Sequence, residues 1–187
     1  PTLDLPAGPN ALGSYGIRMS GTNVVERDNV IVGLNNSASP EPKRLVFGIF
    51  ANQQGVQTSI QDSVRGRVEN AQFGVVHNSS NGNNTYKCKR KTILDIKNSG
   101  VILHAGGTAE KNRIGRIGGP GINLQVADQT FAIKNYIFDS MQDGGIGGAI
   151  FQEQNAANPA LRYFEVIDNE VNNVDSSTGT GFSSVAG

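Results

Sequence analysis

Two histidines are the side chains of this sequence best suited to acid–base chemistry near neutral pH. His104 follows His77 by 27 positions, and imidazole is the side chain that titrates closest to neutrality. Each histidine follows a glycine at a different distance, so on alternating strands their side chains would leave opposite faces. A one-residue bulge would bring them together. We expect His77 to be an inner or turn residue and His104 to be the better catalytic candidate.

Cationic side chains form a second chemical candidate. The segment YKCKRKTILDIK and its neighbouring repeats would stack into one basic patch, which contains Arg65, Arg67, Lys87, Lys89, Arg90, Lys91, Lys111, Arg113 and Arg116. Such a patch suits the carboxylates of uronic acids or the sulfates of a polysaccharide. The competing interpretation is a solvated face, where Asp62, Glu69, Asp95 and Glu110 neutralise the cations. We favour the solvated face.

Carboxyl groups give a weaker signal. Hydrolysis of a glycosidic bond needs two of them across the scissile bond, and the candidates are Asp139, Asp143 and Glu153. Only Glu153 stands at the end of an apolar strand, so we retain it alone as a catalytic candidate. Cys88 is the single cysteine, and no spacing fits a zinc site. We expect no metal and no cofactor.

Overall composition limits the class of protein. The 187 residues carry 16 Lys and Arg against 16 Asp and Glu, with a pI near 7.3, which removes any global electrostatic case for nucleic acid as a partner. No apolar run approaches the roughly 20 residues of a membrane span. The chain fits one domain. We expect residues 1–15 to be a cap or linker and residues 16–187 to be the domain, cut from a longer polypeptide because the sequence stops inside a strand pattern.

A repeat indicates how these side chains are positioned. With 24 glycines and 20 asparagines, the chain is poorly suited to helices. Short apolar strands that open with glycine recur every 21 to 33 residues, at Gly16, Gly48, Gly74, Gly100, Gly121, Gly148 and Gly181. A second alternating stretch separates each pair. This period predicts a parallel β-helix of about six to seven coils, each stacked on the next.

Alternation assigns the residues of each strand to rows. The residue after each glycine would point inward, in a row of Ile17, Ile49, Val75, Val101, Ile122, Ala149 and Phe182. The next position would point outward, in a row of Arg18, Phe50, Val76, Ile102, Asn123, Ile150 and Ser183. A stacked apolar row on the surface is typical of an interface. We therefore predict a homotrimer along Phe50, Val76, Ile102 and Ile150, with cover by a loop of the same chain as an equal alternative.

Amides form the neighbouring outward row, which contains Ser20, Asn52, Asn78, His104, Gln125, Gln152 and Val185, with Glu153 beside Gln152. Amides beside an apolar strip can bind sugar hydroxyls. The alternative, which we favour, is that these amides bond to neighbouring turns of the same chain.

The glycine-led strands, with the pattern G-[IVF]-x-[LMF], and the strand exits Ile96-Lys97-Asn98 and Ile167-Asp168-Asn169 resemble the right-handed parallel β-helix superfamily, also called pectin-lyase-like. The resemblance covers the chain from about Gly16 onward. It implies carbohydrate contact, because the superfamily includes polysaccharide lyases and hydrolases, sugar epimerases and the shafts of phage tailspikes. Lyases of this fold use Lys or Arg to neutralise a carboxylate and abstract the adjacent proton, which implies a catalytic role for Arg90 beside His104 and Glu153. Substrate contacts would come from Asn52, Asn78, Lys89, Arg113, Gln125 and Gln152.

Two functions follow as expectations. The first is an extracellular, carbohydrate-directed β-helix that binds polysaccharide and degrades it as a lyase or hydrolase. The second is a structural or receptor-binding shaft of a trimeric phage tailspike or fibre, located on the virion surface and without catalysis in this chain. Both include sugar contact, so catalysis separates them.

Overall fold

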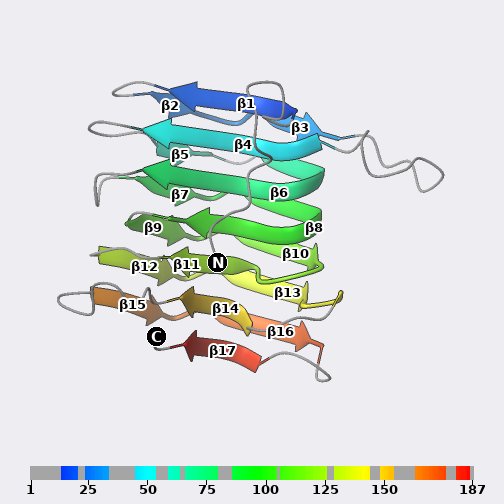
Figure 1. Ribbon diagram of the computed structural model, residues 1–187, viewed down its shortest axis with the longest axis vertical. Helices are drawn as coiled ribbons and strands as arrows, with labels where there is room; N and C mark the ends of the chain where they lie inside the picture. Colours follow the sequence, from blue (N-terminus) through cyan, green and yellow to red (C-terminus); the bar gives the residue numbers. More distant parts are fainter. Residues whose placement is uncertain are drawn as a thin grey trace.

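The computed structural model describes most of the chain, and within it every regular element is a β-strand (Figure 1). The described residues are 14–20, 24–33, 45–53, 59–63, 66–79, 86–104, 106–125, 129–143, 148–153, 163–175 and 180–185. The expected cap at 1–15 and the sequence end therefore lie almost wholly outside them. None of these residues belongs to a helix that could cross a membrane.

The strands form two sheets in which every pairing is parallel. The smaller sheet has six strands, β2 (Val25–Glu26), β5 (Ser59–Gln61), β7 (Lys87–Lys89), β9 (Gly107–Glu110), β12 (Gln129–Ile133) and β15 (Tyr163–Ile167). The larger has eleven, β1 (Tyr15–Ser20), β3 (Val30–Val32), β4 (Leu45–Gln53), β6 (Arg67–Ser79), β8 (Thr92–Leu103), β10 (Arg113–Ile117), β11 (Ile122–Gln125), β13 (Tyr136–Ser140), β14 (Gly148–Glu153), β16 (Glu170–Val174) and β17 (Thr180–Val185).

The order of the strands shows how the chain winds. It passes from the larger sheet to the smaller and back, as in β11–β12–β13 and β14–β15–β16, and each passage stacks on the one before (Figure 1). The long strands β6 and β8 serve two coils each, since the first part of β6 pairs with β3 and the second part with β4. Six coils and the opening strand of a seventh result. The expectation of an all-β parallel solenoid with six to seven coils is therefore confirmed.

Glycine recurs because the coils approach closely at one corner. A Cβ added at Gly74 would lie 2.3 Å from the carbonyl oxygen of Gly100, and one at Gly48 would lie 2.6 Å from that of Gly74. Neither distance is tolerable for a real Cβ, so the repeat is a steric requirement of coil stacking. The series continues from Gly100 to Gly121, but there the next coil presents Ala149 in place of a glycine.

Because Ala149 occupies the corner, each residue of β14 lies one position away from the row that the sequence predicts for it. Ile122 pairs with Ile150, so the inner row is Ile17, Ile49, Val75, Val101, Ile122 and Ile150. The backbone of Phe182 pairs with Ile150. Alignment on Gly148 was wrong, because Ala149 occupies the corner position. The second inner row likewise continues from Leu124 to Gln152. Gln152 is buried, so its predicted place among the outward amides is wrong, and Gln125 pairs with Glu153 in its place.

The outward apolar row is already buried within the single chain. Phe50, Val76 and Ile102 are 1–3% exposed and form a second apolar cluster with Phe47. The Phe47 ring stacks on those of Tyr15 and Phe73, with centroids 5.4 and 5.5 Å apart. Ile150 does not belong to this row. An open apolar strip, the observation on which the predicted homotrimer depended, is therefore missing from this part of the surface.

Candidate functional site

The predicted amide row is reproduced only in part at the ends of the parallel strands. Asn52 pairs with Asn78, and Gln125 pairs with Glu153. Asn52 is exposed, whereas Gln125 is buried. His104 follows β8 directly, and its backbone N–H donates to the carbonyl of His77 at 3.0 Å. The position of Glu153 is given by its backbone alone.

His77 occupies the inner position that the sequence predicts, between Ala51 and Leu103. Its ring stacks on that of Tyr86 with centroids 4.0 Å apart, and neither ring nitrogen has a well-aligned hydrogen bond within the described residues. Burial lowers the pKa of His77 to about 4, against a smaller opposing effect of the Gly106 backbone. The histidine is therefore neutral near pH 7 and buried away from any substrate.

The three predicted catalytic residues are not brought together. His104 precedes β9, while Arg90 follows β7, so they lie at opposite ends of the strands of the smaller sheet. Glu153 ends β14, two coils from β8. Arg90 is exposed in a turn with a φ of 61°. The arrangement gives no common acid–base centre for these three side chains.

The predicted basic patch is mostly neutralised by the four acidic residues named from the sequence. Glu110 binds both Lys89 at 3.0 Å and Lys111 at 3.3 Å. Although burial alone would raise it, these two ammonium groups hold the pKa of Glu110 below its usual value. Three further cations of the patch also pair with these acids, Arg116 with Asp95, Arg67 with Glu69 and Lys91 with Asp62. The favoured interpretation of paired charges is confirmed, with Lys91 buried rather than solvated.

Arg113 has a different environment, on the outer face of the larger sheet. Its guanidinium carbon lies 5.3 Å from the ring centroid of Phe138, which stacks on Tyr136 with centroids 5.3 Å apart. We call Arg113, Tyr136 and Phe138 the aromatic platform. Arg113 pairs with Tyr136 across β10 and β13, and the side chains between them, Ile114 and Ile137, point into the core.

Gly115 makes room for the platform. A Cβ at this position would lie 2.1 Å from Cζ of Phe138, so the ring lies directly over the glycine. The next strand, β16, brings polar groups to the same face, since Glu170 pairs with Tyr136 and Asn172 with Phe138. Asn172 donates from Nδ2 to Glu170 at 2.9 Å. Partly exposed aromatic rings beside a guanidinium, a carboxylate and an amide form a surface suited to a sugar ring.

Sequence reasoning named Arg113 but missed both aromatic residues. The alternation in TFAIKNYIFDS places Tyr136 and Phe138 on one face and Ile137 on the other. The same alternation that assigns the first strand of each repeat to rows is therefore the signal in the sequence that identifies them.

Asparagines also stack inside the turns that follow the smaller sheet. The Asn112 side chain donates a hydrogen bond to Oδ1 of Asn135 at 3.0 Å. The Asn135 side chain donates in turn to Oδ1 of Asn169 at 2.8 Å. The Nδ2 groups of Asn112 and Asn135 each also donate to a backbone carbonyl of the preceding coil, at Cys88 and Ala109. Their burial and full hydrogen bonding give this asparagine ladder a structural role.

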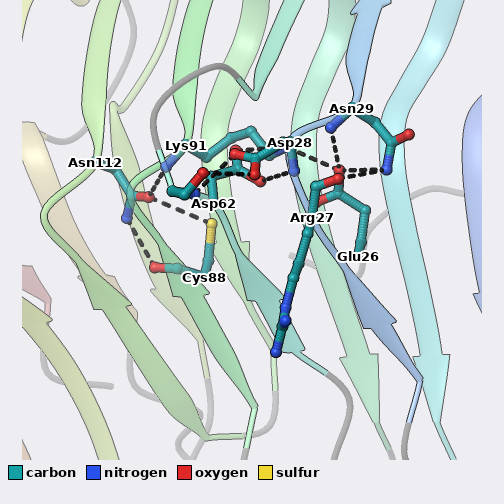
Figure 2. Close-up of polar contacts among 9 residues, drawn as sticks. Glu26, Arg27, Asp28, Asn29, Asp62, Cys88, Lys91 and Asn112 are labelled. Carbon is teal, nitrogen blue, oxygen red and sulfur yellow. Dashed lines mark hydrogen bonds and ion pairs between the residues drawn. The ribbon is translucent and has the colours of Figure 1, made fainter.

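One further polar group lies inside the same end of the solenoid. Figure 2 shows Glu26, Asp62 and Lys91 between Asn29 on one side and Asn112 on the other. Lys91 Nζ lies 3.0 Å from Glu26 Oε1 and 2.7 Å from Asp62 Oδ2. Glu26 was not predicted as a member of this group, because it is separated from Lys91 by 65 positions.

Among the described residues, no group of histidine, cysteine, aspartate and glutamate side chains is arranged to hold a metal ion. Comparison with known proteins finds no matching family, no matching curated protein and no matching solved structure.

Proposed function

We propose that this chain is a carbohydrate-directed, right-handed parallel β-helix that binds polysaccharide along its outer surface outside the cell or on a virion. The observation that carries the proposal is the aromatic platform, in which Tyr136 and Phe138 stack beside Arg113 on an outward face. Right-handed winding is supported by the general rule for crossovers between parallel strands and by the unequal coil lengths, which argue against a uniform hexapeptide solenoid.

The chemistry of the platform matches a sugar. The apolar face of a pyranose ring packs on aromatic rings, while its hydroxyls take hydrogen bonds from polar side chains. Here Glu170 and Asn172 stand one strand further along the same face. Arg113 adds a charge that suits a uronate or a sulfate. Binding therefore needs no deep pocket and can extend from coil to coil.

A second candidate function is a receptor-binding shaft without catalysis in this chain, as in a phage tailspike or fibre. It is favoured by the separation of His104 and Arg90 to opposite ends of the smaller sheet. Degradation by a lyase or hydrolase mechanism remains the alternative.

Titration calorimetry with neutral, uronic and sulfated polysaccharides tests the proposal. Tyr136→Ala and Phe138→Ala are expected to weaken binding by about tenfold each, since a stacked aromatic contact contributes about 0.5–1.5 kcal/mol beyond its buried area. Phe164→Ala is the matched control, because Phe164 is an exposed aromatic on β15 of the other sheet. Equal affinities for all three variants, or no binding by the wild type, would remove the proposal.

The same samples separate the two candidates. Release of reducing ends or unsaturated uronates would show degradation, and His104→Ala and Arg90→Ala would then be compared for loss of product. Binding without product supports the shaft.

A further inference from the structure

Lys91 and Asp62 are charged residues whose side chains are both fully buried. The Lys91 side chain is 0% exposed, and it reaches Asp62 Oδ2 at 2.7 Å and Glu26 Oε1 at 3.0 Å. Glu26 ends β2, Asp62 follows β5 and Lys91 follows β7, so three consecutive coils each contribute one member. We call these three side chains the buried triad (Figure 2).

The surroundings of the triad are apolar. Glu26 heads the inner row of the smaller sheet, which continues with Ile60, Cys88, Ala109 and Ala132, all 0% exposed. Two carboxylates and one ammonium in such a place leave an unbalanced charge, which is strongly unfavourable. Burial raises the pKa of Asp62, against the opposing effect of Lys91. This direction makes the neutral acid easier to form at Asp62 than at a solvent-exposed aspartate.

The two oxygens of Asp62 differ in their contacts. Oδ1 accepts a hydrogen bond of 2.7 Å from the backbone N–H of Asp28, which polarises the carbonyl. Oδ2 faces Lys91 Nζ but has no well-aligned hydrogen bond. Gly66 provides the space for Oδ2, because a Cβ there would lie only 1.7 Å from it. An amine, a polarised carboxyl and an unbonded oxygen are thus held in one place.

Glu26 is positioned as a base for the amine. Its Oε1 accepts from Lys91 Nζ and is held in place by the backbone N–H and the side-chain amide of Asn29, at 3.1 and 2.9 Å. Oε2 has no hydrogen-bond partner within the described residues. One oxygen can therefore take a proton from Nζ while the carboxyl group as a whole remains fixed.

We propose that Lys91 and Asp62 condense into an intramolecular isopeptide bond, with Glu26 as the catalytic residue that transfers the proton. The Lys91 ammonium first gives one proton to Oδ2 of Asp62, 2.7 Å away, which leaves a neutral amine beside a neutral carboxyl group. The lone pair of Nζ then attacks Cγ of Asp62, and Glu26 takes the second proton that the nitrogen loses. The charge that develops on Oδ1 is stabilised by the Asp28 N–H. Glu26 then returns the proton to Oδ2, the Cγ–Oδ2 bond breaks, and one water molecule leaves. The step involves no oxidation or reduction and needs no co-reactant.

The product removes two of the three ionisable side chains from the buried triad. An amide replaces one ammonium and one carboxyl group, so only Glu26 remains ionisable. The bond also joins the turns after β5 and β7 covalently. The inference does not depend on polysaccharide binding and would hold for any function of the chain.

Intact-mass measurement of the 187-residue chain, unfolded immediately before analysis, tests the proposal. The expected mass is that of the linear sequence less one water molecule. Trypsin should not cut after Lys91, and a branched peptide should appear that joins residues 45–65 to residues 91–97. A mass equal to that of the linear sequence, with cleavage after Lys91, would overturn the proposal without any variant.

Variants identify the chemistry. Glu26→Gln and Lys91→Arg should each restore the mass of the water molecule, after allowance for the substituted atoms. Asp62→Asn should either stay linear or lose ammonia in place of water. Glu110→Gln is the matched control, because Lys89 and Glu110 form an ion pair of the same 3.0 Å length on the surface. Loss of water that persists in Lys91→Arg would assign the dehydration to another residue and refute the bond.

Discussion

Replacement of Asn135 by alanine tests whether the asparagine ladder holds the coils together. The side chain makes four hydrogen bonds, donating to Ala109 and Asn169 at 2.9 and 2.8 Å and accepting from the backbone and side chain of Asn112, both at 3.0 Å. Asn135 and Asn112 are each 1% exposed, so water cannot replace the lost partners. At about 1 kcal/mol for each bond, the free energy of unfolding should fall by about 4 kcal/mol.

Urea unfolding followed by far-ultraviolet circular dichroism measures this change. Asn172→Ala is the control, since Asn172 is exposed and makes its hydrogen bond to Glu170 at the surface. It should change the free energy of unfolding by less than about 0.5 kcal/mol. Amide hydrogen exchange gives a second measurement, in which the Asn112 N–H should lose protection. A loss below about 1 kcal/mol for Asn135→Ala, with Asn112 still protected, would refute the argument.

His77 and Gly74 provide two further predictions. Because the folded pKa of His77 is about 4, well below its ordinary value of 6.5, the fold binds fewer protons than the unfolded chain. The contribution of neutral His77 to the free energy of unfolding should therefore be fully present above pH 6.5. It should fall by about 3 kcal/mol as the pH approaches 4. His77→Phe, which keeps a ring against Tyr86, should remove that part of the pH dependence of urea unfolding, and an unchanged profile would contradict it. Gly74→Ala should lower stability by about 2–3 kcal/mol, because its Cβ meets the backbone of the next coil; an unchanged melting temperature would contradict the steric explanation of the repeat.

Rows of the first strand in each repeat were predictable because each strand obeys the same local rule. Five consecutive inner residues, from Ile17 to Ile122, pair as expected. The prediction was wrong at Ile150 because glycine was taken as the marker of every corner, whereas Ala149 occupies the corner in the coil of β14. That single shift also moved Gln152 from the surface into the core.

The buried triad and the burial of the outward row were beyond such reasoning. Lys91 contacts Glu26 across 65 positions. This contact depends on the lengths of the loops between them, which no periodicity determines. Cover over Phe50 and Ile102 likewise depends on the whole chain rather than on strand alternation. Pairing of Glu110 and Asp95 with nearby cations was predictable, since neighbouring coils place residues about 20 positions apart side by side.

The ladder from Asn112 to Asn135 also makes one coil a removable unit. Deletion of residues 112–134 would join Lys111 to Asn135, so a residue with positive φ would still precede the ladder asparagine, as at every other member. Strand β9 would then pair with β15, because both pair with β12 in the intact chain. Strand β8 would pair with β14, because both pair with β11, and β13 would likewise gain a new neighbour. Such a solenoid can lengthen or shorten in evolution by whole turns without designing a new interface. The length of the molecule is therefore free to vary while its cross-section is conserved.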